Sequence, residues 1–210
     1  MTTAIYGGSF NPPHAGHVSV ACTVARELKP DRFLIIPDYA APHKLMAAGS
    51  PEPAQRLEMC RLAFGDISGA EVSDIEISRG GRSYTADTIA ALRQFYPNDR
   101  FFLVVGSDML LSFTKVWYRY DYILSECTLV VLSRSEGDIP ELEKAASQLR
   151  DGNTGAEVIL LRNHDVLEVS STEVREMLAL EKSAELCGKG LLTRPVCNYI
   201  VENGLYSDNR

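Results

Sequence analysis

Two histidines stand where a short apolar segment gives way to a helical pattern. The segment Gly7–His17 reads GGSFNPPHAGH and follows the apolar residues 4–6. Apolar side chains then recur at helical spacing from Val18 to Leu28. This order predicts a strand, a glycine-led turn and a helix with both histidines at its amino end. Such a turn offers backbone N–H groups and the positive end of a helix dipole, so it predicts a site for an anion such as a phosphate.

A second segment, Val169–Arg175, reads VSSTEVR. Ser170 and Glu173 have the spacing of a capping box, which predicts the start of a helix. Taken alone, this segment is explained by a well-capped helix. In the same way, a single histidine in a loop is usually a solvated or capping side chain without a role in chemistry. Two histidines around a glycine at a helix start are harder to explain in that way.

The elements that must position these residues alternate along the chain. Apolar or alternating segments predict strands at 4–6, 32–36, 71–78, 101–105, 128–132 and 158–161. Five separate stretches have helical patterns: one after residue 14, one starting at Ser50-Pro51, one through Ile89 to Phe95, an aromatic-rich one from Trp117 to Tyr122, and one over 141–149.

This alternation predicts an α/β fold with a doubly wound, mostly parallel, Rossmann-like sheet that carries helices on both faces. We expect one domain over residues 1–210, with two or three short helices in a C-terminal extension from about residue 170. Ligands bind such sheets beyond the carboxyl ends of the strands. The first turn, the loop 37–44 and the turn 106–108 should therefore converge.

Composition limits the function classes. A chain of 210 residues with 45% hydrophobic and 23% charged residues is typical of a globular protein with a buried core. A formal charge of −7 argues against general nucleic-acid binding, so an anionic ligand would need a local cluster of positive groups. The amino-terminal residues show no secretory signal pattern, and the apolar runs are far shorter than a membrane span of roughly 20 residues. The five cysteines include no Cys-x-x-Cys pair, which predicts free thiols, no zinc site and a cytoplasmic location.

The segment His14–His17 resembles the His-x-Gly-His signature of the nucleotidylyltransferase superfamily, and Val169–Arg175 resembles its second signature. The resemblance implies that Gly8 lets the backbone approach the ATP phosphates and that His17 donates to phosphate oxygens. It implies that the start of the second helix and Arg175 bind the triphosphate, where a guanidinium can pair with a phosphate through two hydrogen bonds. The ATP-binding residues that it implies are Gly7, Gly8, Ser9, Phe10, His14, His17, Gly106, Asp108, Ser171, Thr172 and Arg175.

Further segments resemble the nicotinate-nucleotide adenylyltransferases within that superfamily. They are Pro37 with Pro42-His43-Lys44, Arg79 with Ser83-Tyr84-Thr85 and Thr88, Gly106-Ser107-Asp108 with Trp117, and the ending from Val196 to Tyr206. The implied mononucleotide-binding residues are Lys44, Tyr84, Thr85, Asp108, Trp117 and Arg134, with Trp117 stacked on the pyridine ring. The implied catalytic residues are His14, His17, Lys44 and Arg175. The chain differs from the residues usual in this family at Ser9, Asn11 and Ser107, and around Arg134.

The resemblance implies transfer of AMP from ATP to nicotinate mononucleotide in NAD biosynthesis, with Mg²⁺ bound through the ATP phosphates and no metal held by side chains. Two alternatives stay open: a superfamily member acting on another phosphorylated acceptor, such as phosphopantetheine or glycerol phosphate, and a non-catalytic nucleotide sensor. The sequence does not separate the nicotinate from the nicotinamide mononucleotide. The dipole of the helix that starts near Thr85 favours the acid. A homodimer is left open, and neither nucleic acid nor membrane is expected as a partner.

Overall fold

A single parallel sheet forms the centre of the molecule. The computed structural model describes residues 1–42, 46–133, 136–152, 155–162 and 169–207. Its six strands lie in the order β3-β2-β1-β4-β5-β6, and every pair of neighbours is parallel. The strands are β1 (Thr2–Gly8), β2 (Arg32–Pro37), β3 (Ala70–Val72), β4 (Arg100–Gly106), β5 (Cys127–Ser133) and β6 (Glu157–Arg162). The predicted doubly wound fold is confirmed.

Helices cover both faces of this sheet. Alternate strand residues point to opposite sides, so each face carries apolar side chains that pack against helices. On one face Ala4, Phe33 and Val104 join an apolar cluster with five helices. These are α1 (Ala15–Leu28), α2 (Pro53–Phe64), α9 (Ser171–Ala179), α10 (Ser183–Gly188) and α11 (Arg194–Glu202).

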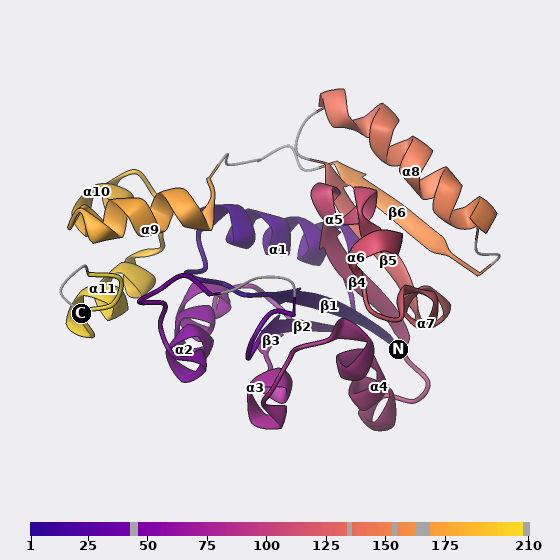
Figure 1. Cartoon of the computed structure of the whole chain (residues 1–210), viewed down its shortest axis with the longest axis horizontal. Helices are drawn as coiled ribbons and strands as arrows, with labels where there is room; N and C mark the ends of the chain where they lie inside the picture. The colour runs from indigo at the N-terminus through magenta and orange to yellow at the C-terminus, as the bar shows by residue number, and fades with distance from the viewer. Residues whose placement is uncertain (43–45, 134–135, 153–154, 163–168, 208–210) are drawn as a thin grey trace.

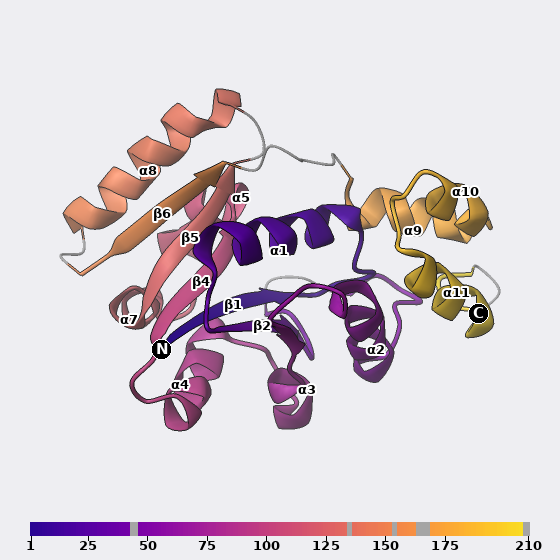
Figure 2. The same ribbon diagram turned by 180° about the vertical axis from the view of Figure 1, so that it is seen from behind.

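The other face holds a second apolar cluster, to which Ile5 and Leu103 belong. Its helices are α3 (Ile75–Arg79), α4 (Thr85–Phe95), α5 (Ser107–Leu111), α6 (Phe113–Val116), α7 (Tyr120–Glu126) and α8 (Ile139–Gly152), and a short 3-10 turn spans Glu136–Asp138. Figures 1 and 2 show that α9, α10 and α11 gather at one end of the molecule, while β6 and α8 lie at the other.

The sheet order places the switch point between β1 and β4. From β1 the chain proceeds to β2 on one side, and β4 lies on the other side of β1. Tyr6 pairs with Val104, so Gly8 and Gly106 each lie two residues beyond that pair at the same edge. Asp38 donates its N–H to the Gly8 carbonyl at 3.0 Å, which joins the ends of β1 and β2. The predicted convergence of the three loops is therefore confirmed for their described residues.

Three local predictions were wrong. Residues 71–78 do not form one strand: β3 ends at Val72, and α3 starts at Ile75. Asp74 precedes this helix, where its carbonyl and carboxylate accept hydrogen bonds from the N–H and hydroxyl of Ser78. Helix α2 begins at Pro53 rather than at residues 50–51. The aromatic-rich stretch from Trp117 to Tyr122 is not one helix: residues 117–119 lie between α6 and α7, and α7 begins at Tyr120.

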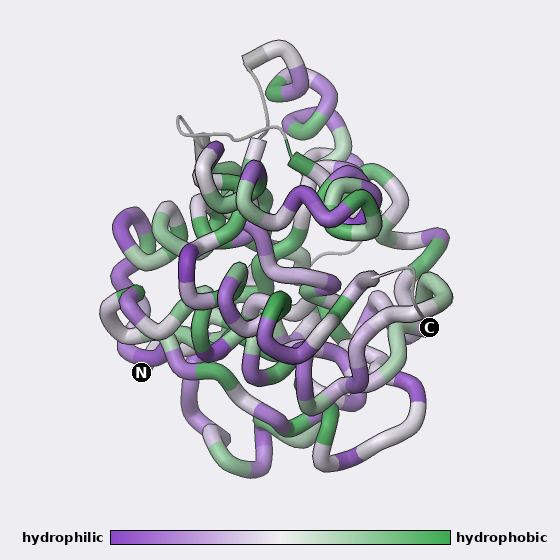
Figure 3. The backbone as a smooth tube through the Cα atoms, turned by 90° about the vertical axis from the view of Figure 1, so that its left-hand side faces the viewer, coloured by the Kyte–Doolittle hydropathy of each residue, from purple (hydrophilic) through white to green (hydrophobic). Residues whose placement is uncertain are grey.

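All five cysteines are free thiols, of which only Cys22 is exposed. Burial raises the pKa of the Cys127 thiol to about 12, which keeps it protonated. Among the described residues, none of the helices is long and apolar enough to cross a membrane. Figure 3 shows that hydrophobic and hydrophilic residues are mixed along the backbone.

Candidate active site

The two histidines of the first turn are held against each other at the start of α1. His14 precedes the helix, and its backbone N–H donates to Nδ1 of His17 at 3.2 Å. Their ring centroids are 3.7 Å apart with the planes tilted by 33°. Because Nδ1 of neutral His17 accepts a hydrogen bond, its proton lies on Nε2. Half-buried His17 can therefore donate from Nε2.

His14 is buried, with 7% of its surface exposed. Burial lowers the pKa of its imidazole from 6.5 to about 4, and the nearby Glu173 carboxylate acts in the opposite direction. His14 is therefore neutral at neutral pH. A Cβ atom at Gly16 would lie 3.1 Å from the His14 ring and 3.3 Å from Val169, so a larger residue here would press on both neighbours.

Several N–H groups at the start of α1 already have partners. Ala15 donates to the Leu191 carbonyl at 2.9 Å, and both His17 and Val18 donate to the His14 carbonyl. The sequence predicted an anion site built on unpaired N–H groups, and these three do not supply it. At this turn the predicted phosphate donor is the imidazole of His17. The dipole of the 14-residue helix α1 also remains.

Helix α9 brings an arginine to the same turn. Ser170 and Glu173 form the predicted capping box at its start. One turn further, Nη1 of Arg175 donates to the Asn11 carbonyl at 2.9 Å, and Nη2 donates to the Thr172 hydroxyl at 3.0 Å. Asn11 is 164 residues away in the sequence. These two bonds fix the plane of the guanidinium next to the histidine turn.

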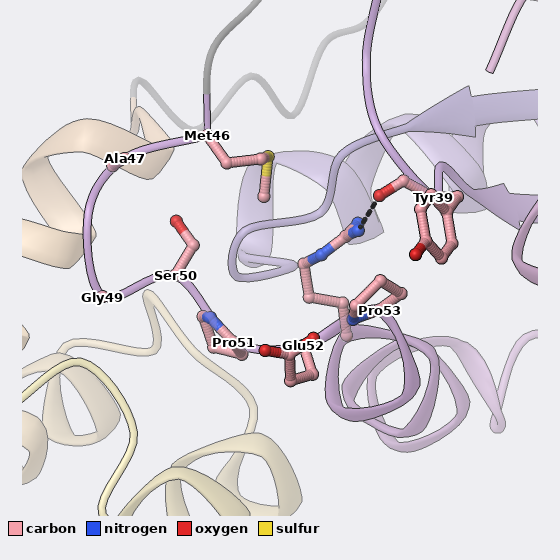
Figure 4. A pocket seen from close by; sticks show the side chains of 9 residues that line it. Tyr39, Met46, Ala47, Gly49, Ser50, Pro51, Glu52 and Pro53 are labelled. Carbon is pink, nitrogen blue, oxygen red and sulfur yellow. Dashed lines mark hydrogen bonds between the residues drawn. The ribbon is translucent and has the colours of Figure 1, made fainter. Parts of the chain in front are cut away.

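A buried arginine joins the first turn to the loop after β2. Arg56 of α2 is 1% exposed, and its Nη1 donates to the Ser9 carbonyl at 2.7 Å and to Oδ1 of Asp38 at 3.0 Å. Its Nη2 donates to the carbonyls of Asp38 and Tyr39 at 2.7 and 3.0 Å. The dashed line in Figure 4 marks the bond to Tyr39. The Ser9 hydroxyl donates to the other oxygen of Asp38 at 2.6 Å, so the two loops form one unit.

A pocket of about 300 Å³ opens beside this unit. In Figure 4 the Met46 and Ser50 side chains point into it from one side and Tyr39 lies on the other. Its lining is Tyr39, Met46, Ala47, Gly49, Ser50, Pro51, Glu52, Pro53 and Arg56. The pocket therefore lies between the loop after β2 and the start of α2.

Aromatic side chains dominate the other half of the candidate site. Tyr84 precedes the first residue of α4, and its ring centroid lies 4.8 Å from that of exposed Tyr118. Half-buried Trp117 stacks on Phe113, with centroids 4.9 Å apart and planes 26° apart. These contacts place the segment 117–118 beside the start of α4.

The start of α4 rests on a buried carboxyl group. The Thr88 hydroxyl donates to Glu76 at 2.6 Å and accepts from Arg79 at 3.0 Å. Burial raises the pKa of the Glu76 carboxyl, while hydrogen bonds from Thr88 and Ser83 and the charge of Arg79 oppose this rise. Ser83 accepts from the Tyr39 N–H at 2.9 Å, which connects this half to the loop after β2.

Comparisons with known proteins identify the family. A family model described as cytidylyltransferase-like matches residues 5–177. A protein of Geobacter metallireducens named "probable nicotinate-nucleotide adenylyltransferase" is 33% identical over the full length of both chains. A protein of the same name from Gemmatimonas aurantiaca is 37% identical, over 99% of this chain and 93% of its own. The chain belongs to the nicotinate-nucleotide adenylyltransferase family.

A solved structure agrees with the fold of this family. The nicotinic acid mononucleotide adenylyltransferase of Plasmodium falciparum, complexed with NaAD, aligns over 98% of this chain and 97% of its own with a TM-score of 0.78. The sequence identity is 20%. At that identity the likeness supports the fold alone.

In this member of the nicotinate-nucleotide adenylyltransferase family, most of the predicted site residues lie at one edge of the sheet. Gly7, Gly8, Ser9 and Phe10 lie at the end of β1, Gly106 and Asp108 at the end of β4, and Ser171 and Thr172 at the start of α9. Tyr84 precedes α4 and Thr85 is its first residue, beside the segment that holds Trp117. Lys44, with His43, and Arg134 lie outside the described residues. The roles of all these residues in binding and catalysis stay predictions.

Sequence reasoning missed the residues that hold the site together. Arg56 was one, although it lies four residues before buried Cys60 and eight before buried Phe64, on the same face of α2. That spacing was a usable signal for a buried arginine. The partners of Asn11 had no local signal, because they come from residues 50, 175 and 206.

Proposed function

We propose that this protein transfers the AMP unit of ATP to nicotinate mononucleotide, forming nicotinate adenine dinucleotide and pyrophosphate in NAD biosynthesis. Membership of the nicotinate-nucleotide adenylyltransferase family supports the proposal. The structural observation that carries it is the bond from Arg175 to the Asn11 carbonyl. This bond assembles a guanidinium and two imidazoles at the switch point of the sheet, where a polyanion can be bound.

In the proposed reaction, a phosphate oxygen of the acceptor attacks the α-phosphorus of ATP. A new P–O bond forms while the bond to the pyrophosphate oxygen breaks, and pyrophosphate leaves with that electron pair. The nucleophile is already an anion, so no strong general base is required. The protein must align two polyanions that repel each other and stabilise the charge that grows on the leaving group.

The described residues suit these two tasks. We propose that the His17 imidazole donates from Nε2 to the ATP phosphates, since its Nδ1 accepts from the backbone, and Arg175 carries a permanent charge in a plane fixed by Asn11 and Thr172. These imidazole and guanidinium donors suit an anion rather than a bare cation. We therefore propose that Mg²⁺ enters bound to the ATP phosphates, where it neutralises part of their charge.

The acceptor is proposed to bind between the start of α4 and Trp117. The N-terminal dipole of an 11-residue helix favours a carboxylate over a neutral amide, so we propose the nicotinate form as the preferred acceptor. Trp117 offers an aromatic surface for the pyridine ring, and the adjacent Tyr84–Tyr118 pair borders it.

Product analysis by mass spectrometry tests the reaction class. The protein is incubated with ATP, Mg²⁺ and one acceptor at a time, and we expect nicotinate adenine dinucleotide with nicotinate mononucleotide. In the reverse direction, this dinucleotide and pyrophosphate should give ATP. A product formed instead from phosphopantetheine, or from CTP and glycerol phosphate, would assign a different acceptor. ATP binding without any product would favour a nucleotide sensor.

A further inference from the structure

The C-terminal segment reaches back to the first turn. Tyr206 follows α11, is 9% exposed, and belongs to the same apolar cluster as Phe10. Its hydroxyl donates to Oδ1 of Asn11 at 2.8 Å, across 195 residues of sequence. Both partners are buried, so the bond is shielded from water. The last described segment of the chain thus contacts the turn that carries the two histidines.

The backbone of Tyr206 is strained in a way that serves this contact. Its φ angle is +64°, in the left-handed region that residues with a side chain rarely adopt. Such a conformation persists only where the surrounding structure holds it. Here the burial of the ring and the hydrogen bond of the hydroxyl hold it, which points to a specific placement of this side chain.

Asn11 joins three separate parts of the chain. Its side-chain oxygen accepts from Tyr206, and its side-chain nitrogen donates to the Ser50 hydroxyl at 2.7 Å. Its backbone carbonyl accepts from Nη1 of Arg175 at 2.9 Å. Because both ends of the side-chain amide are held, Asn11 has little freedom to rotate. The carbonyl that anchors Arg175 is held with it.

We propose that Tyr206 is a positioning residue for the nucleotide: its hydroxyl holds Asn11, and through the Asn11 carbonyl it holds the Arg175 guanidinium in the orientation that receives the ATP triphosphate. This inference rests on the proposed function, since it takes ATP as the donor. Loss of the hydroxyl leaves Oδ1 of Asn11 buried without this partner and loosens the anchor of Arg175. The consequence is weaker binding of ATP, while acceptor binding at the start of α4 is unchanged.

The test measures binding of a non-hydrolysable ATP analogue with Mg²⁺ by calorimetry, without any acceptor. Tyr206→Phe keeps the ring and removes only the hydroxyl. We expect it to weaken binding on the order of 10-fold, the effect of one buried hydrogen bond. In an Arg175→Lys background the same change should have no further effect, because Tyr206 acts through the guanidinium. Tyr199→Phe, which removes the hydroxyl of a half-buried tyrosine on α11, should bind as the wild type does.

Unchanged binding in Tyr206→Phe would overturn the proposal. An equal loss in both Arg175 backgrounds, or an equal loss in Tyr199→Phe, would also overturn it, since either result indicates a general loosening of the C-terminal helices. If Tyr206→Phe fails to fold, Ser50→Ala releases the other end of the Asn11 amide and should weaken binding in the same way; unchanged binding in that variant contradicts the proposal. A wild type that does not bind the analogue refutes the proposed function instead.

Discussion

The two halves of the candidate site are built differently. The half around the first turn consists of buried polar contacts between distant parts of the chain, with Asn11 and Arg56 at their centres. The half around Trp117 consists mainly of aromatic rings that are half-buried or exposed. Some of its contacts are local in the sequence, such as the stacking of Trp117 on Phe113.

This difference matches the two tasks of the proposed reaction. Charge that develops on a leaving group is stabilised by donors that are fixed before the reaction, which the first half provides. Recognition of an aromatic ring needs contact area in the ground state and the transition state alike, which the second half provides. Variants in the first half should therefore affect stability and turnover, and variants in the second half should affect the KM of the acceptor.

Loss of Arg56 should have the largest effect. Arg56→Met leaves the Asp38 carboxylate buried without its cation, and we expect the free energy of unfolding to fall by about 3–5 kcal/mol. Urea denaturation measures this. The control is Arg61→Met on the same helix, whose 53%-exposed side chain pairs with Glu58 and should contribute little. Similar stabilities of the two variants would contradict a structural role for the Arg56 contacts.

Removal of the His17 imidazole should have the largest effect on turnover. His17→Ala should lower kcat on the order of 100-fold, about 3 kcal/mol, as expected for the loss of one preorganised donor. Steady-state kinetics with both substrates would show this, with the acceptor KM nearly unchanged. A variant that turns over at the wild-type rate would remove His17 from the mechanism.

Protonation of His14 should make the fold sensitive to acid. The folded pKa of about 4 lies below the unfolded value of 6.5, so the unfolded chain binds more protons in this window and the unfolding free energy rises with pH. From about pH 7 to about pH 5, we expect a loss of about 2 kcal/mol from this group.

The comparison variant for this measurement is His14→Gln, which cannot titrate at that position. The buried Glu76 carboxyl, whose pKa is raised, contributes in the opposite direction in both proteins, so the difference between the two pH profiles isolates His14. Identical profiles would show that His14 titrates normally.

Loss of the Trp117 ring should have the smallest effect and should be confined to binding. Trp117→Ala should raise the KM of the mononucleotide about fivefold, near 1 kcal/mol, with kcat almost unchanged. Phe95→Ala, which removes a 70%-exposed aromatic ring at the far end of α4, is the matched control. A KM equal to that of the control would make Trp117 a purely structural residue.

The sequence predicted those features that depend on local patterns. The strand, turn and helix around His14 and His17 follow from glycines and helical spacing, and the start of α9 follows from its capping box. The alternation of apolar and polar residues at 71–78 wrongly predicted a strand, because buried Glu76 belongs to a helix and accepts a hydrogen bond from Thr88 of α4. Tertiary contacts decided that element.

The contacts that unite the site had no comparable local signal. The bonds from Tyr206 and Arg175 to Asn11 depend on how the C-terminal helices pack against the first turn, across 195 and 164 residues. A sequence shows these side chains but not their partners.

The most direct test of the proposed function is the release of pyrophosphate by the wild-type protein from ATP and Mg²⁺, with nicotinate and nicotinamide mononucleotides compared at equal concentrations. We predict rapid release with the acid and much slower release with the amide, because the carboxylate is favoured at the start of α4. Equal rates would contradict the assignment of selectivity to that helix. No release with either acceptor would contradict the proposed function itself.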